Sequence, residues 1–186
     1  MRVTVGGRGL TLVQGDITGE RVDAIVTAAN SALAGGGGVD GAVHRAAGPA
    51  LLAECRLVDG GCPTGQAVAT PPGKLPVKRV IHAVGPIWGE ERGREDELLA
   101  SAHRRALEVA AAEGCTSIAF PAISCGVYGF PVDRAARIAL STIVEHLAGE
   151  TPLREVRYVL FSRADLATFR AGLEEVARSD PRVTPA

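Results

Sequence analysis

The stretch from Ala24 to Gly48, AIVTAANSALAGGGGVDGAVHRAAG, constrains the fold more than any other part of the chain. Apolar residues open it, four consecutive glycines follow at positions 35–38, and an alanine-rich segment closes it from Asp40 onward. This order predicts a strand, a glycine loop and a helix. Glycines let backbone N–H groups approach a ligand, and the first turn of a helix presents free N–H groups to an anion. The stretch therefore predicts a site for a phosphate-containing ligand.

Two polar residues frame this loop. Asn30 follows the strand and Asp40 begins the helix, so an amide and a carboxylate are available on either side of a ligand. Each has a simpler interpretation, because Asp often caps helices and Asn often turns the chain. The stretch alone leaves Asp40 open between a cap and a functional carboxylate. Neither the GxxxxGKS/T pattern nor the GxGxxG pattern of common nucleotide sites is present, so the loop is not an ordinary nucleotide-hydrolase or dehydrogenase cradle.

Length and charge predict one domain without a general affinity for nucleic acid. The 186 residues suit a single core, with residues 1–180 in one domain and residues 181–186 as a frayed tail. The formal charge of −1 gives no attraction to polyanions as a class. No apolar run is long enough to span a bilayer, and the N-terminus lacks the apolar segment of a secretory signal. We therefore expect a cytoplasmic protein with no membrane partner.

The four cysteines predict reduced thiols and no structural metal. Cys55, Cys62, Cys115 and Cys125 form no CxxC pair, and no histidine stands at zinc-finger spacing. Cys125 lies in a glycine-containing loop and has two interpretations, a nucleophilic thiol or a small loop filler. No neighbouring His or Lys supports activation of the thiol, so the filler is favoured.

Strand and helix patterns alternate along the chain. Strands are predicted at 2–5, 10–16, 22–29, 66–70, 78–84, 117–122 and 156–161. Helices are predicted at 40–57 with a break at 48–49, and at 95–113, 132–147 and 164–177. This alternation predicts a three-layer α/β/α sandwich with a mixed central sheet of about six or seven strands. Ligands of such sheets bind at the carboxyl ends of the strands.

A second glycine-containing loop, Ser124 to Phe130, joins another predicted strand to a helix. Two such loops at one sheet edge suit a diphosphate held by backbone N–H groups. Tyr128 or Phe130 can supply an aromatic wall for a sugar or base. Asp16, at a further strand end, can accept a hydrogen bond from a base amino group or cap a short helical turn. The residues thus predict a ligand resembling a nucleoside diphosphate, with the polar pair of the first loop near one end.

Five segments of the chain resemble the macrodomain family, specifically its MacroD-like branch, which includes bacterial O-acetyl-ADP-ribose deacetylases. They are QGDIT at 14–18, VDAIVTAANSALAGGGGVDGAVHRAAG at 22–48, CPTGQA at 62–67, VIHAVGP at 80–86 and SIAFPAISCGVYGFP at 117–131. They cover most of residues 10–145 in the family's order. The chain departs from the usual family pattern at Thr27, where Asn is common, and at Cys125, where Thr is common.

The resemblance implies roles for individual residues. Asp40 matches the carboxylate that orients or activates the hydrolytic water, and Asn30 matches the amide that contacts the distal ribose. The other implied residues bind the ligand. They are Asp16 and Ile17 at the adenine, Gly36, Gly37, Gly38 and Val39 over the distal ribose, Ser124, Cys125, Gly126, Val127 and Tyr128 at the phosphates, and Phe161 as the adenine wall.

The resemblance implies a hydrolase that needs neither cofactor nor metal. Such an enzyme cleaves ester-linked ADP-ribose from acidic side chains of proteins and deacetylates O-acetyl-ADP-ribose, so mono-ADP-ribosylated proteins are its expected partners. The alternative is a non-catalytic module that reads ADP-ribose, and the presence of Asp40 with Asn30 favours the enzyme. The nearly neutral charge and the absence of a basic aromatic surface in the sequence give little support for binding of RNA or poly(ADP-ribose).

Overall fold

The glycine-rich stretch folds as the sequence predicts. In a computed structural model that describes residues 1–186, strand β3 (Ala24–Ala28) leads through the glycine loop into helix α1 (Gly38–Ala47). Helix α2 (Pro49–Arg56) follows directly, because Gly48 ends α1 with a positive φ and Pro49 suits the first turn of a new helix. The predicted break at 48–49 is confirmed.

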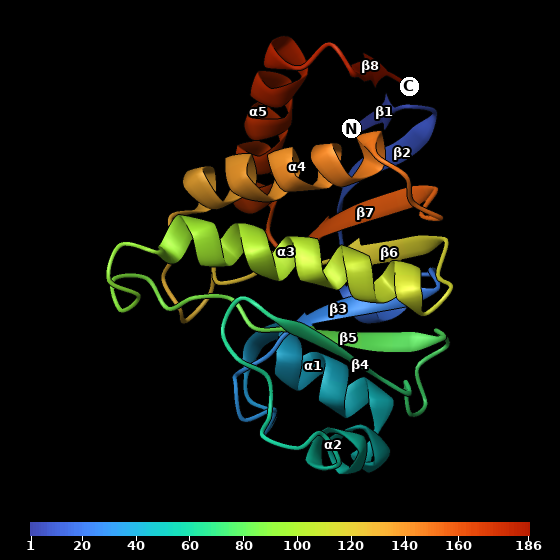
Figure 1. Ribbon diagram of the computed structural model, residues 1–186, viewed down its shortest axis with the longest axis vertical. Coiled ribbons are helices and arrows are strands. Elements are labelled where there is room, and N and C mark those ends of the chain that lie inside the picture. Colours follow the sequence, from blue (N-terminus) through green and yellow to red (C-terminus); the bar gives the residue numbers. More distant parts are fainter.

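The remaining elements complete an α/β/α sandwich (Figure 1). The strands are β1 (Arg2–Val5), β2 (Arg8–Gln14), β4 (Ala67–Thr70), β5 (Arg79–Ala83), β6 (Ser117–Phe120), β7 (Glu155–Leu160) and β8 (Val183–Pro185). The helices are α3 (Glu95–Ala112), α4 (Val132–Ala148), α5 (Arg163–Ser179) and a short 3₁₀ helix, η1 (Ile17–Gly19). None of the helices combines the length and apolarity needed to cross a membrane.

The sheet is mixed, and its strand order is β4-β5-β3-β6-β7-β2-β1-β8. The five central strands from β5 to β2 pair in parallel, whereas β4, β1 and β8 are antiparallel to their neighbours. The parallel strands end at one edge, where a doubly covered sheet normally holds its ligand. Both glycine loops leave the sheet at this edge.

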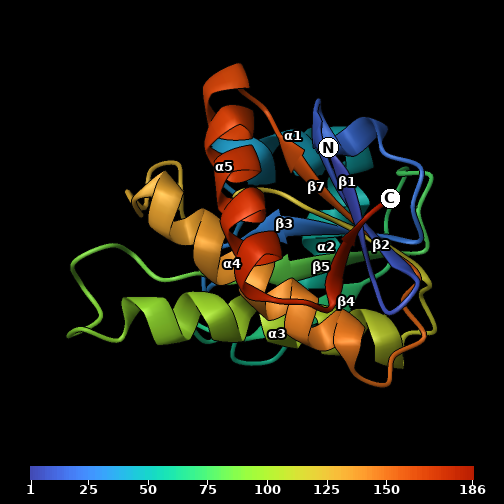
Figure 2. The same ribbon diagram turned by 90° about the horizontal axis from the view of Figure 1, so that it is seen from above.

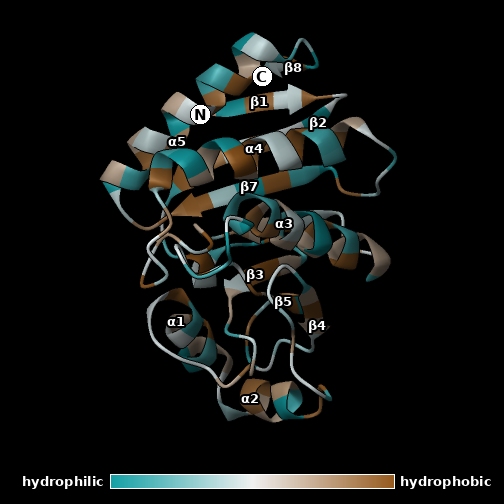
Figure 3. Ribbon diagram, turned by 60° about the vertical axis from the view of Figure 1, so that its left-hand side comes forward, coloured by the Kyte–Doolittle hydropathy of each residue, from teal (hydrophilic) through white to brown (hydrophobic).

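Apolar side chains cover both faces of the sheet. The larger core lies under α3, α4 and α5, and a second cluster lies under α1 and α2, on the opposite face (Figure 2). In β6, Ile118 and Phe120 face the larger core and Ala119 faces the smaller one, which explains the continuous apolar run of this strand. Helices α4 and α5 alternate hydrophobic and hydrophilic residues, as expected for helices with one buried side (Figure 3).

The expectation of a frayed tail over residues 181–186 is wrong for Val183–Pro185. These residues form β8, which pairs with β1 in the register Val3 to Pro185 and Val5 to Val183. Strand β1 would otherwise be an edge with unpaired N–H and C=O groups, and Val183 joins the larger core. The sheet therefore has eight strands, one more than the predicted maximum, and both chain ends lie at its β1–β8 edge (Figure 1).

Candidate active site

The two glycine loops meet at a cavity of about 810 Å³ at the carboxyl ends of β2, β3, β6 and β7. Every site residue predicted from the sequence lines this cavity, and these residues come from separate segments of the chain. They are Asp16, Ile17, Asn30, Gly36, Gly37, Gly38, Val39, Asp40, Ser124, Cys125, Gly126, Val127, Tyr128 and Phe161. The predicted convergence of the two loops on one crevice is therefore confirmed.

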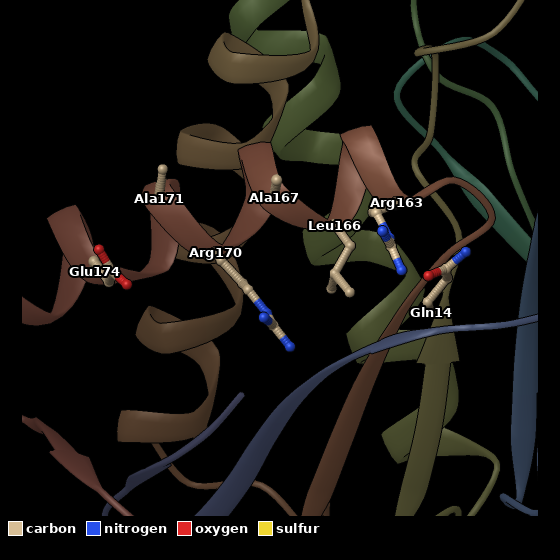
Figure 4. Close-up of a pocket in the computed structure, with 7 residues that line it drawn as sticks. All are labelled: Gln14, Arg163, Leu166, Ala167, Arg170, Ala171 and Glu174. Carbon is tan, nitrogen blue, oxygen red and sulfur yellow. The ribbon is translucent and has the colours of Figure 1, made fainter.

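A second cavity, of about 610 Å³, runs along α5 beside the end of β2 (Figure 4). Six of its seven lining residues belong to α5, including Arg163 and Arg170, and the seventh is Gln14. None of the predicted site residues lines it. The cavity at the strand ends is the better candidate, because several elements bring backbone N–H groups, an amide and carboxylates together there.

Asn30 braces the first glycine loop. Its Nδ2 donates to the Gly35 carbonyl at 2.8 Å, and its Oδ1 accepts from the Ala34 N–H at 3.0 Å. Asn30 therefore shapes the loop as a turn-forming residue while it lines the cavity. The turn-forming interpretation of Asn30 is confirmed, and its contact with a ligand stays a prediction.

Asp40 is not a helix cap. Gly37 occupies the N-cap of α1 without a side-chain hydrogen bond, and Asp40 lies inside the first turn. Its side chain is nearly buried, its Oδ1 accepts a hydrogen bond from Thr27 Oγ1 at 2.8 Å, and His44 Nε2 lies 3.6 Å from the same oxygen. Burial raises the pKa of Asp40, and the Thr27 hydrogen bond and the nearby His44 partly oppose that shift. The structure thus places a partly desolvated carboxylate at the floor of the cavity.

Three side chains from α1, α2 and β5 lie close together behind Asp40. His44, Cys55 and His82 each bring one ligating atom within 4.8 Å of the others, and the sequence spacing gave no signal of this group. Thr70 Oγ1 lies 2.9 Å from His82 Nε2. Burial lowers the pKa of His82 to about 4 and raises that of Cys55 to about 11. At neutral pH Cys55 and His82 are therefore both uncharged, and the protonated thiol is not a preformed metal ligand.

The second loop is strained at Ser124. This residue has a φ of 64°, and its buried Oγ has no hydrogen-bond partner. The Phe130 N–H closes the loop by donating to the Ser124 carbonyl at 2.9 Å. Strain and an unpaired polar group inside a ligand cavity are typical of functional loops.

Cys125 has the chemistry of a filler. Burial raises the pKa of its thiol to about 12, and the residue packs against the larger core. The thiolate needed for nucleophilic attack is therefore scarce at neutral pH.

Another part of the cavity lining combines a fixed carboxylate with an exposed aromatic ring. Asp16 Oδ1 accepts hydrogen bonds from the backbone N–H and the hydroxyl of Thr18, which lower the pKa of Asp16 and cap η1. Phe161 is 84% exposed. An exposed aromatic side chain at a cavity mouth suits a stacking ligand. Asp16 thus serves as a cap and faces the cavity as well.

Sequence reasoning missed two charged residues of the cavity, Arg45 and Asp165. Arg45 is the one basic side chain of the lining, and the three-residue spacing of Val39, Ala42 and Arg45 on α1 was a signal that could have found it. Asp165 belongs to the first turn of α5, which begins two residues after Phe161. With one arginine in the lining, an anionic ligand must be held largely by backbone N–H groups.

Comparison with known proteins agrees with this geometry. The pattern of the Macro domain family matches residues 26–139. An O-acetyl-ADP-ribose deacetylase of Klebsiella pneumoniae is 51% identical over 162 residues, which cover 86% of this chain and 93% of that protein. A macro domain-containing protein of Caldanaerobacter subterraneus is 52% identical over 170 residues, which cover 90% and 97%.

The fold comparison gives the same family. The structure of an Oceanobacillus iheyensis macrodomain with ADP superposes with a TM-score of 0.92 at 42% sequence identity, and the match covers 97% of each chain. The family pattern spans more than half of this chain, and the relatives match it over nearly their whole length. The chain belongs to the macrodomain family.

Proposed function

We propose that this macrodomain binds ADP-ribose and hydrolyses esters on its distal ribose. The substrates are ADP-ribose esters of acidic protein side chains and O-acetyl-ADP-ribose. The observation that carries the proposal is the buried Asp40 carboxylate at the cavity floor, beside the loop that Asn30 braces. The name of the Klebsiella relative and the ADP held by the Oceanobacillus macrodomain support it.

In this proposal, each part of the cavity lining binds one part of the ligand. Backbone N–H groups of residues 124–128 and of the start of α1 hold the diphosphate. Phe161 stacks on the adenine, and Asp16 accepts a hydrogen bond from its amino group. Asn30 and the glycine loop orient the distal ribose over Asp40. The proposed mechanism uses no metal and no cofactor.

Asp40 acts as the general base. Its carboxylate takes a proton from a water whose oxygen attacks the ester carbon, and the proton returns to the departing ribose oxygen as the ester bond breaks. The products are a carboxylic acid and a free ribose hydroxyl. Since this step requires ionised Asp40, activity should fall as the pH drops through the raised pKa of Asp40.

The test compares the wild type with Asp40→Ala on both substrates, following release of acetate and of ADP-ribose. We expect turnover to fall by about a hundred- to ten-thousandfold, the usual contribution of a general base, while calorimetry shows ADP-ribose binding largely retained. Asp59→Ala is the control, because Asp59 is an exposed carboxylate outside the cavity. Full activity of the Asp40 variant would remove Asp40 from the mechanism. ADP-ribose binding by a wild type that hydrolyses neither substrate would identify a reader module instead.

A further inference from the structure

Thr27 is the single polar side chain of β3, and it is completely buried. The strand alternates, so Thr27 faces α1 and α2 together with Ile25, while Val26 faces the larger core. A valine would fill such a position with better strand propensity and without burying a hydroxyl. A buried hydroxyl is costly unless it makes a hydrogen bond, so the group that accepts its hydrogen bond indicates what the hydroxyl does.

That partner is Asp40. Thr27 Oγ1 donates to Asp40 Oδ1 at 2.8 Å, and no other group of the chain donates a hydrogen bond to this side chain. His44 Nε2 approaches the same oxygen but stays at 3.6 Å. Asp40 Oδ2 accepts no hydrogen bond within the chain and is not sealed from solvent. Thr27 therefore fixes one carboxylate oxygen and leaves the other available to the cavity.

We infer that Thr27 is a positioning residue for Asp40, which sets the orientation of the carboxylate. The inference rests on the proposed function for its catalytic consequence. The Thr27 hydroxyl has one proton to donate and gives it to Asp40. Thr27 itself does not line the cavity, whereas Asp40 does.

The titratable groups around Asp40 come from three elements. His44 lies on α1, Cys55 on α2 and His82 on β5, where His82 is the strand partner of Thr27. Cys55 and His82 are uncharged near neutral pH, as described above. Removal of the Thr27 hydroxyl therefore leaves His44 as the one nearby group that can support the charge of Asp40.

The experiment compares Thr27→Val, which removes the hydroxyl at nearly constant shape, with Thr27→Ser, which keeps it. For Thr27→Val we expect kcat to fall about 10- to 100-fold, the usual effect of losing a hydrogen bond to a charged group, with little change in KM. The acid limb of the pH profile should move to higher pH, because loss of a hydrogen-bond donor raises a carboxyl pKa. Thr27→Ser should retain most of the activity, and the acid limb of its pH profile should lie where that of the wild type does.

Thr11→Val is the matched control. Thr11 lies in the same sheet, on β2, and its buried hydroxyl makes no hydrogen bond. This variant should leave kcat and the acid limb unchanged. Thermal melting of every variant separates loss of folding from loss of positioning. A Thr27→Val protein with the kcat and the acid limb of the wild type would overturn the inference. It would also be overturned if Thr27→Ser and Thr27→Val both fold and lose activity to the same extent.

A measurement without substrate separates this inference from the proposed function. The carboxyl ¹³C shift of Asp40, assigned with Asp40→Asn, gives its pKa in the wild type and in both Thr27 variants. We expect a higher Asp40 pKa in Thr27→Val than in the wild type or Thr27→Ser. An unchanged pKa would overturn the inference even if the enzyme is active. If the wild type hydrolyses neither substrate, the proposed function fails and this titration still decides what Thr27 does.

Discussion

In the proposed mechanism, Asp40 must be ionised for hydrolysis, although burial of its carboxylate favours the protonated form. Burial raises its pKa in the folded state, so the folded protein favours the protonated form. The stability that this group contributes is present below its unfolded-state pKa and is lost as the pH rises through the raised folded-state pKa. At neutral pH the ionised Asp40 that the proposed mechanism requires is therefore a buried charge that destabilises the fold.

Asp40→Asn should consequently raise Tm at pH 7 by a few degrees while it abolishes hydrolysis. The amide removes the charge, and its oxygen can still accept the Thr27 hydrogen bond. Calorimetric melting at pH 7 and pH 3.5 checks this, because the gain should disappear where wild-type Asp40 is itself protonated. An Asp40→Asn protein less stable than the wild type at pH 7 would show that the charge is well compensated.

The glycine loop packs directly against α1 at Gly41. A Cβ added at Gly41 would lie 2.5 Å from the Gly36 carbonyl oxygen, so the loop rests directly on the helix backbone. This contact holds Gly36–Gly38 over the cavity. The glycines of the loop itself were recognisable in the sequence, whereas the role of Gly41 depends on a close approach that only the folded chain shows.

Gly41→Ala should lower both stability and ADP-ribose affinity, although alanine is normally better than glycine inside a helix by about 1 kcal/mol. The added methyl must displace the loop, and we expect at least a tenfold loss of affinity by calorimetry. Gly19→Ala is the control, since a Cβ there meets no atom within 4 Å. Improved Tm and wild-type affinity in the Gly41→Ala protein would contradict this account of the loop.

The sequence predicted the elements of this fold well because their signals are local. Spacing of apolar residues located α3, α4 and α5, and the Gly48–Pro49 pair located the break between α1 and α2. Strand β8 escaped prediction because Val183–Pro185 are too few for a pattern and are ordered by β1, nearly the whole chain length away. The local pattern left Asp40 open between a cap and a functional carboxylate, because the position of the N-cap at Gly37 depends on how the loop enters the helix.

Across the whole molecule, buried histidines make the fold sensitive to acid. Burial lowers the pKa of His82 and of His103 to about 4. Burial keeps both side chains neutral; His82 contacts Thr70, and the Leu99 carbonyl beside His103 only partly opposes the effect of burial. A depressed histidine pKa contributes stability that is present above the unfolded-state pKa near 6.5 and is lost as the pH falls toward 4.

The free energy of unfolding should therefore fall between pH 6.5 and pH 4, by up to about 1.4 kcal/mol per pH unit for each histidine. Urea titrations at intervals across this range measure the slope. A His103→Gln variant should be less stable than the wild type at pH 7 but should show a shallower slope. A stability that stays constant from pH 7 to pH 4 would mean that both histidines are protonated without strain on the fold.

Strand β8 has a topological consequence as well. Its antiparallel pairing with β1 brings residue 186 opposite residue 2, so the backbone nearly closes into a ring at the edge of the sheet. The chain could therefore begin at a different residue without changing which strands pair with one another. A short bridge between the ends and a new opening in the Gly89–Gly93 loop would yield a circular permutant with the same sheet, loops and cavity.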